Sequence, residues 1–142
     1  MTDDVGRALA SVRDWLGNRR PEVVVVLGSG LGGFTERLED PRVLPYGSVP
    51  GMAAAAVEGH VGEFVAGRLS DREILVQRGR FHLYEGHDAA AIALPVRLAA
   101  RLGARALILT NAAGGIHPTL APGDLMLIAD QVNLSFRNPL IG

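Results

Sequence analysis

The feature that most limits the possible folds of this 142-residue chain is a short run of branched apolar residues near its N-terminus. Residues 22–27 read EVVVVL, with no polar residue among the apolar ones after the glutamate. A strand of this kind is buried on both faces, as a central strand of an α/β sheet is. A glycine-rich stretch, GSGLGG at residues 28–33, follows directly. The sequence therefore predicts a buried strand that ends in a tight loop.

One helix is expected before this strand and another well after it. Apolar residues recur at helical spacing over residues 5–16, and Gly17 and Asn18 suit the left-handed turn that ends such a helix. The second helix is expected to begin near Asp88, a good N-cap residue, and to stop at Gly103.

Four further segments have the composition of strands, whereas the segment that carries Pro41 and Pro45 offers no regular strand ending in an acidic residue. A polar turn at Ser70 and Asp71 joins the first two of the four. Because strands alternate with helices, the expected class is α/β, with a mixed, mostly parallel central sheet flanked by helices, in a single domain over residues 1–142. The four segments are residues 64–69, 74–77, 106–109 and 125–128.

The composition argues against several classes of protein. The 14 basic residues, all arginine, balance 15 acidic ones, and a net charge of −1 argues against a nucleic-acid binder. The start, MTDDVGR, does not resemble a secretory signal, and the sequence has no apolar run of about 18 residues that could cross a membrane. Zero cysteines exclude disulfides and thiolate chemistry. We expect a cytoplasmic globular protein without a membrane or nucleic-acid partner.

The glycine-rich loop at residues 28–33 suits an anion. Its glycines let main-chain N–H groups approach a ligand, and the hydroxyl of Ser29 can donate to a phosphate oxygen. The spacing also satisfies the dinucleotide-binding pattern G-x-G-x-x-G, but no regular second strand ending in an acidic residue follows. A tight turn without any ligand is the third interpretation, and the loop alone does not decide among them.

Residues 78–87, RGRFHLYEGH, are rich in polar side chains. In an extended conformation Arg80, His82 and Tyr84 share one face, while Phe81 and Leu83 point into packing. A guanidinium fork matches two phosphate oxygens, an imidazole can donate to a third, and a phenol suits a sugar hydroxyl. The alternative is an edge strand with a solvated arginine and an ordinary histidine.

The other histidines carry a weaker signal. His60 stands alone before an expected strand, and without other support an ordinary surface or core role is the simpler interpretation. The scattered positions of His60, His82, His87 and His117 do not favour a metal site. We therefore expect no metal.

A third polar group, TNAAGG at residues 110–115, follows an expected strand. Ligands of open α/β sheets bind at the carboxyl ends of strands, where small residues leave room. Asn111 could hydrogen-bond a substrate, and the N–H of Ala112 could meet an anion. The alternative is a strand that simply ends in a glycine turn.

Taken together, these segments resemble purine nucleoside phosphorylases, and more narrowly the trimeric class that acts on 6-oxopurine nucleosides. The resemblance covers nearly the whole chain from about residue 22 and rests on five separated motifs in one order. The motifs are GSGLG at 28–32, VPG at 49–51 with GH at 59–60, GRFHLYEG at 79–86, TNAAGG at 110–115, and GDLM at 123–126 with NPL at 138–140.

The resemblance implies a reaction and a role for each matching residue. The reaction is reversible phosphorolysis of purine (deoxy)ribonucleosides to free purine and (deoxy)ribose 1-phosphate, in purine salvage. Inorganic phosphate is a co-substrate, no cofactor or metal is implied, and the complete family member would be a homotrimer. The phosphate-binding residues would be Ser29, His60, Arg80, His82 and the main chain of Ala112, with His82 also catalytic and Tyr84 lining the ribose site.

The chain also departs from the family. Family members are roughly twice as long, and the glutamate and asparagine that recognise the purine lie in the half to which nothing here corresponds. We therefore expect an N-terminal half with weak or no activity and with exposed apolar sheet surface. Gln131 stands where a histidine is usual, and Phe136 where glycine is common. The alternatives are a non-catalytic phosphate-binding or interaction module, a methylthioadenosine phosphorylase, and a nicotinamide-cofactor domain.

Overall fold

The computed structural model describes residues 2–52 and 61–140 and contains a five-stranded sheet in the order β2-β3-β4-β1-β5. The strands are β1 (Val23–Leu27), β2 (Glu39–Pro45), β3 (Glu63–Leu69), β4 (Arg72–Arg78) and β5 (Ala106–Leu109). β1 pairs in parallel with β4 and β5, whereas β3 pairs antiparallel with β2 and β4. The expected α/β class with a mixed sheet is confirmed.

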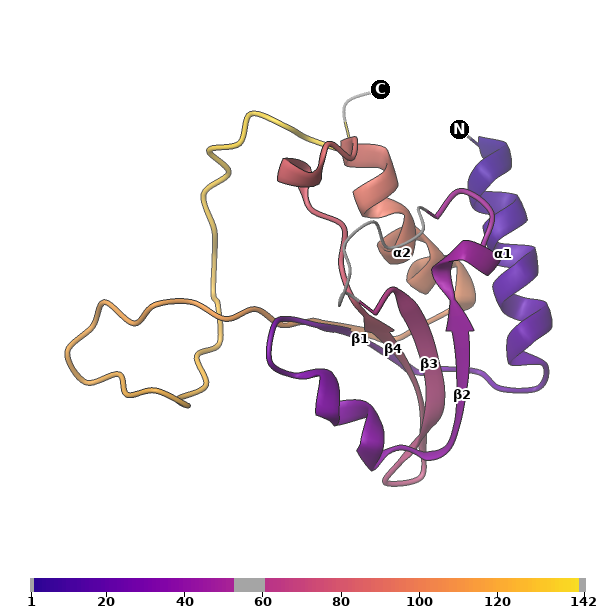
Figure 1. The fold of residues 1–142 in the computed structure, drawn as a ribbon, viewed down its shortest axis with the longest axis horizontal. Helices are drawn as coiled ribbons and strands as arrows, with labels where there is room; N and C mark the ends of the chain where they lie inside the picture. Colours follow the sequence, from indigo (N-terminus) through magenta and orange to yellow (C-terminus); the bar gives the residue numbers. More distant parts are fainter. Residues whose placement is uncertain (1, 53–60, 141–142) are drawn as a thin grey trace.

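Two α-helices, α1 (Thr2–Leu16) and α2 (Ala89–Leu102), cover one face of the sheet (Figure 1). Their apolar sides pack against Val24, Phe64 and Leu75, which reach this face from three neighbouring strands. Within residues 2–52 and 61–140, no helix is long and apolar enough to cross a membrane.

Both helices end at the predicted glycines, and α2 begins at its predicted cap. Gly17 follows α1 with φ +61°, and Gly103 follows α2 with φ +88°, both in the left-handed region that suits glycine. The side chain of Asp88 accepts a hydrogen bond from the N–H of Ala91 at 2.6 Å and so caps the first turn of α2.

The opposite face of the sheet is covered by a short 3-10 helix, η1 (Gly32–Arg37), which follows the loop after β1 (Figure 1). Because Val24 packs on one face and its neighbour Val25 on the other, β1 is buried on both sides, as its unbroken apolar run predicted. The buried side chains on this second face are Val25, Leu27, Leu38, Val65, Ile74 and Val76.

The hairpin of β3 and β4 was also predicted, and its turn explains why two polar residues join the strands. Ser70 and Asp71 have φ values of +49° and +63°, and two successive positive φ angles are what a tight two-residue hairpin turn requires. The turn fixes a register in which Phe64 lies opposite Gln77 and Val65 opposite Val76.

β2 was not among the expected strands, although it ends at Pro45 and so agrees with the expectation that no strand here ends in an acidic residue. β2 lies at the edge of the sheet, where a proline can direct its missing N–H away from the ladder. The pairing with β3 shifts register between Glu39 and Arg42, on either side of Pro41. The prolines therefore limited the regularity of this strand without preventing it.

The chain beyond Leu109 leaves the sheet and runs as an extended excursion of irregular structure to residue 140 (Figure 1). The strand expected at residues 125–128 is not formed there. A strand needs a neighbour to complete its ladder, and this segment has none, with Leu125 100% and Leu127 96% exposed. The expected exposure of apolar surface is confirmed, because Ile108 of β5 is also 49% exposed.

Candidate active site

The candidate site lies where β1, β4 and β5 end. These strands are parallel, so their carboxyl ends share one edge of the sheet, and each is followed by one of the polar motifs. Thr110 links two of these ends. Its N–H and its hydroxyl both donate to the carbonyl oxygen of Val26, at 3.0 and 2.9 Å, and its Oγ1 accepts the N–H of Gly28 at 2.8 Å.

Gly28 is the point where the first and third motifs touch. A Cβ atom at this position would lie 2.7 Å from the carbonyl oxygen of Thr110 and 2.8 Å from the Cα of Asn111, so only glycine fits. Gly30, with φ +84°, turns the chain sharply after it, and Ser29 lies exposed between them. The loop therefore brings the backbone of Gly28 against Asn111 and leaves Ser29 exposed next to that contact in the chain.

The strand topology contradicts the dinucleotide-binding interpretation of this loop. That fold needs a helix after the glycines and then a parallel strand beside the first. Here the six-residue 3-10 helix η1 follows, and the next strand, β2, lies at the far edge of the sheet and pairs antiparallel with β3. The match to G-x-G-x-x-G is therefore coincidental.

Arg80 brings the second motif to the same place. It lies just beyond the end of β4, is half-buried, and donates from its guanidinium to the carbonyl oxygen of Thr110 at 3.0 Å. The three segments that the sequence analysis singled out, at residues 28–33, 78–87 and 110–115, thus meet through Gly28, Thr110 and Arg80.

His82 is held by Glu85, a residue that the sequence analysis did not single out. The main-chain N–H of His82 donates to Oε2 of Glu85 at 2.8 Å, and Nδ1 of His82 lies 3.2 Å from Oε1 of the same carboxylate. His87 Nε2 lies 3.7 Å from Oε2. His82 and Glu85 form a capping box, in which a glutamate stands three residues after the N-cap residue. That spacing is the sequence signal that could have identified Glu85 as the partner of His82.

The same contacts set the protonation of Glu85. The N–H of His82 first, and then the His82 and His87 side chains, lower the pKa of the Glu85 carboxyl below its ordinary value. The carboxylate is therefore ionised at neutral pH and can orient the His82 ring. With Nδ1 turned toward Glu85, the Nε2 side of the ring is left to face a ligand.

The extended conformation expected for this motif holds only as far as His82. His82 has φ −123° and ψ 150°, but residues Leu83–Glu85 form a 3-10 helix, η3. Phe81 packs as expected, 5.4 Å from the ring of Tyr46 and 5.0 Å from that of His87. Leu83 was expected to pack but is 41% exposed, because the helical turn carries it outward.

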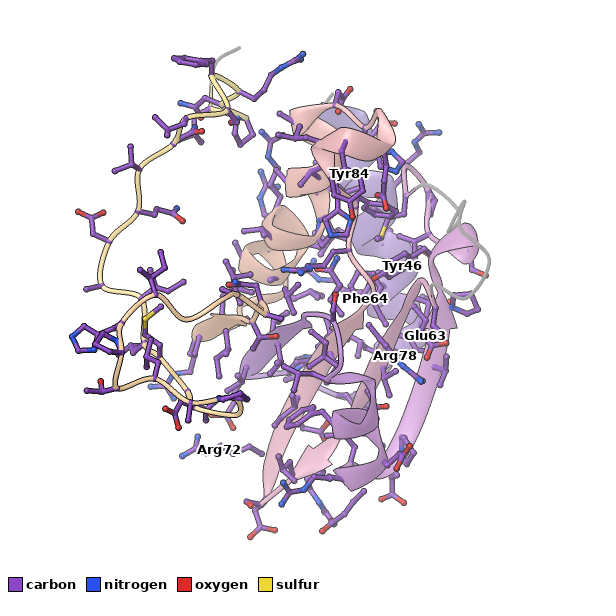
Figure 2. All side chains as sticks on the ribbon, turned by 60° about the vertical axis from the view of Figure 1, so that its left-hand side comes forward. Tyr46, Glu63, Phe64, Arg72, Arg78 and Tyr84 are labelled. Atoms are coloured by element: carbon purple, nitrogen blue, oxygen red, sulfur yellow. The ribbon has the colours of Figure 1, made fainter. Side chains whose placement is uncertain are left out.

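Tyr84 shares a face with His82, although by ring stacking within the turn and not by strand alternation. The two ring centroids are 4.7 Å apart and their planes differ by 16°. The Tyr84 side chain is 80% exposed, at the end of the molecule away from Arg72 (Figure 2). Its phenol is open to a ligand that approaches the strand ends.

The remaining expected site residues are less constrained. Ala112 is exposed and accepts a hydrogen bond from the side chain of Asn111 at 3.3 Å, through its carbonyl oxygen. His60 lies outside the described residues, so its expected place beside phosphate stays a prediction. His117 is on the exposed segment, where it contacts Thr119. In the part of the chain that the structure describes, no three His, Asp or Glu side chains gather as metal ligands would.

Comparison with known proteins decides the family. The family model of the phosphorylase superfamily matches residues 22–142. This chain belongs to the phosphorylase superfamily. The matched range begins at the residue where the resemblance drawn from the motifs begins, and it includes all three phosphorylase segments that meet at the strand ends.

Individual phosphorylases agree with this assignment. Purine nucleoside phosphorylase 1 of Bacillus subtilis is 42% identical over 142 residues, which is 100% of this chain and 52% of that protein. The purine nucleoside phosphorylase of Rattus norvegicus is 42% identical over 91% of this chain and 47% of its own length. The chain thus spans about half the length of the curated relatives it matches.

A solved phosphorylase structure shows the same fold. Isoform 2 of the purine nucleoside phosphorylase from Schistosoma mansoni, in complex with cytosine and ribose-1-phosphate, superposes with a TM-score of 0.88 at 38% sequence identity. The superposition covers 99% of this chain and 50% of that one. The resemblance to purine nucleoside phosphorylases is therefore confirmed at the level of both sequence and fold.

Proposed function

We propose that this chain carries the phosphate-binding part of a purine nucleoside phosphorylase active site. The observation that carries the proposal is the junction at Thr110, which accepts Gly28 N–H through its hydroxyl and Arg80 through its carbonyl oxygen. Three segments far apart in the sequence thereby meet at the ends of the parallel strands, where ligands of α/β sheets bind, and this supports the proposal. Relatives over 40% identical are purine nucleoside phosphorylases, which makes inorganic phosphate the natural anion.

Each phosphate contact has its own donor. The guanidinium of Arg80 offers a fork for two oxygens, and His82, oriented by Glu85, donates from Nε2. The hydroxyl of Ser29 and the main-chain N–H of Ala112 complete the set on the described residues, with His60 as a further member.

The proposed reaction is phosphorolysis of a purine (deoxy)ribonucleoside. A phosphate oxygen attacks C1′ of the sugar, the bond from C1′ to the purine nitrogen breaks with its electron pair going to the base, and (deoxy)ribose 1-phosphate forms. The transition state carries positive charge on the sugar, so a phosphate held beside it is both nucleophile and counter-charge. Tyr84, exposed next to His82, would line the ribose.

In this proposal phosphate serves as co-substrate without a resident cofactor, and the complete enzyme is a homotrimer. The groups that bind the purine would come from the half of the relatives that this chain does not match, so the chain alone is expected to turn over weakly or not at all. A non-catalytic phosphate-binding module is the second candidate, favoured by the exposure of residues 111–140.

The test is phosphate-dependent release of hypoxanthine from inosine. The 142-residue chain is assayed alone and as a chimera in which it replaces the segment it matches in the B. subtilis relative. We expect turnover in the chimera, with loss of activity in its Arg80→Ala and His82→Ala variants. A folded chimera that binds phosphate without turnover would favour the non-catalytic module, and one that does neither would contradict both candidates.

A further inference from the structure

The residue before Arg80 adopts a backbone conformation that only glycine supports. Gly79 has φ +101°, and a Cβ on it would overlap the carbonyl oxygen of Val61. Glycine is also the residue with the widest choice of other conformations. Something besides the lack of a side chain must therefore hold the peptide that leads into Arg80.

Two buried polar side chains converge on the carbonyl oxygen of Gly79. The phenol of Tyr46 donates to it at 2.7 Å, and the amide of Gln77 donates to it at 3.1 Å. Tyr46 is 1% and Gln77 4% exposed. Burial of two such groups costs free energy unless each is hydrogen-bonded, and both direct a donor at this one oxygen.

The Tyr46 side chain is itself rigidly placed. The centroid of its ring lies 5.1 Å from that of Phe64, edge to face (Figure 2). The centroid of the Phe81 ring is 5.4 Å away, and the main-chain N–H of Tyr46 donates to the carbonyl of Gly62 at 2.9 Å. Burial raises the pKa of the phenol, so the hydroxyl keeps its proton and remains a donor.

We infer that Tyr46 and Gln77 are positioning residues for Arg80. The Gly79 carbonyl belongs to the same planar peptide as the N–H of Arg80, so two donors on that oxygen fix the plane from which the Arg80 side chain departs. The far end of Arg80 is tied to the carbonyl of Thr110. Arg80 is thus held at its backbone, through the Gly79 peptide, and at its guanidinium before any anion arrives. The inference rests on the proposed function in that Arg80 is taken to bind phosphate.

Its test uses two variants of the 142-residue chain that remove one donor each, Tyr46→Phe and Gln77→Leu. Val12→Ala is the matched control, because Val12 is buried in the same core as Tyr46 but lies on α1. The control separates a general loss of stability from a specific effect on Arg80. All measurements are made well below the melting temperature of each variant.

The first readout is the side-chain NMR signal of Arg80 in arginine-labelled protein without phosphate, assigned by its loss in Arg80→Lys. We expect it to move or broaden in Tyr46→Phe and Gln77→Leu and to stay in place in Val12→Ala. A signal that is unchanged in the first two variants, or that moves equally in the control, would overturn the positioning role whether or not phosphate binds.

The second readout is affinity for inorganic phosphate by calorimetric titration. Each donor-removing variant is expected to bind roughly three- to tenfold more weakly, the range for one lost hydrogen bond, with no change in Val12→Ala. The loss should vanish in an Arg80→Ala background, because the two donors act through the Arg80 side chain. A loss that persists there would contradict the inference. If Arg80 moves as expected but the unaltered chain binds no phosphate, the positioning role stands and the proposed function fails.

Discussion

Two adjacent strands of the sheet, β1 and β5, have similar sequences and different surroundings. β1 reads VVVVL and is buried on both faces, whereas β5 reads ALIL and its last residue, Leu109, is 63% exposed. The two strands share one parallel ladder. An apolar run is therefore enough to form a strand beside a neighbouring strand, but the burial of that strand depends on the elements that cover its faces.

The same division runs through the candidate site. Gly28, Arg80 and His82 are held by packed elements or by hydrogen bonds to defined partners. Ala112 lies on the exposed segment that follows β5. Arg80 and His82, which we propose to bind phosphate, therefore have fixed partners in this chain, whereas Ala112 lies on an exposed segment.

The largest difference in stability is expected when one apolar side chain is truncated in the packed core and one on the exposed residues 111–140. Phe64→Ala removes a side chain that is 2% exposed and should lower the free energy of unfolding by about 3–5 kcal/mol. Leu127→Ala, at a side chain 96% exposed, should change it by less than about 0.5 kcal/mol. Urea denaturation measures both. A comparable loss in the two variants would show that residues 111–140 pack in solution.

A smaller difference in stability is expected between two glycines, Gly79 in a crowded position and Gly33 in an open one. Gly79→Ala places a Cβ against the carbonyl of Val61 at a φ of +101°, and should cost about 1–3 kcal/mol or more. Gly33 has no positive φ, and a Cβ on it would meet no other atom within 4 Å, so Gly33→Ala should be close to neutral. Thermal unfolding of both variants gives the comparison, which fails if Gly33→Ala is the more damaging.

The smallest expected effect concerns how the stability of the chain depends on pH through Glu85, the partner of His82. The pKa of Glu85 is lower in the folded chain than its ordinary value of 4.5, so its contribution to stability is present above that pH and is lost as pH falls through the folded pKa. Glu85→Gln should therefore lower the melting temperature at neutral pH, with a difference from the unaltered chain that shrinks below about pH 4. A melting-temperature difference that grows as the pH falls would contradict a lowered pKa of Glu85.

Much of the packed region could be predicted because local signals and packing agree there. The apolar run of β1, the Ser70–Asp71 turn and the Asp88 cap each determine their element by short-range chemistry. β2 was missed because Pro41 is usually a breaker, and only its position at the sheet edge makes it tolerable. That position is a property of the tertiary fold, which local sequence does not show.

Two further differences from the sequence analysis also depend on tertiary structure. Residues 125–128 have the composition of a strand but no neighbour to pair with, so the apolar pattern alone was insufficient. Glu85 was missed because its role depends on the turn at Leu83–Glu85, which brings its carboxylate back to His82. The convergence of Gly28, Thr110 and Arg80 follows from the parallel order of three strands and could be expected once that order was assumed.

The most direct test of this account is calorimetric titration of the 142-residue chain with inorganic phosphate, alongside its Arg80→Ala and Arg72→Ala variants. Arg72 begins the strand that ends before Arg80, so it is an arginine control at the opposite end of β4. We predict one saturable site, weakened about 10- to 100-fold by Arg80→Ala, as loss of a charged hydrogen-bond donor implies, and unchanged by Arg72→Ala. Absence of binding, or equal binding by all three proteins, would contradict a phosphate site at the strand ends.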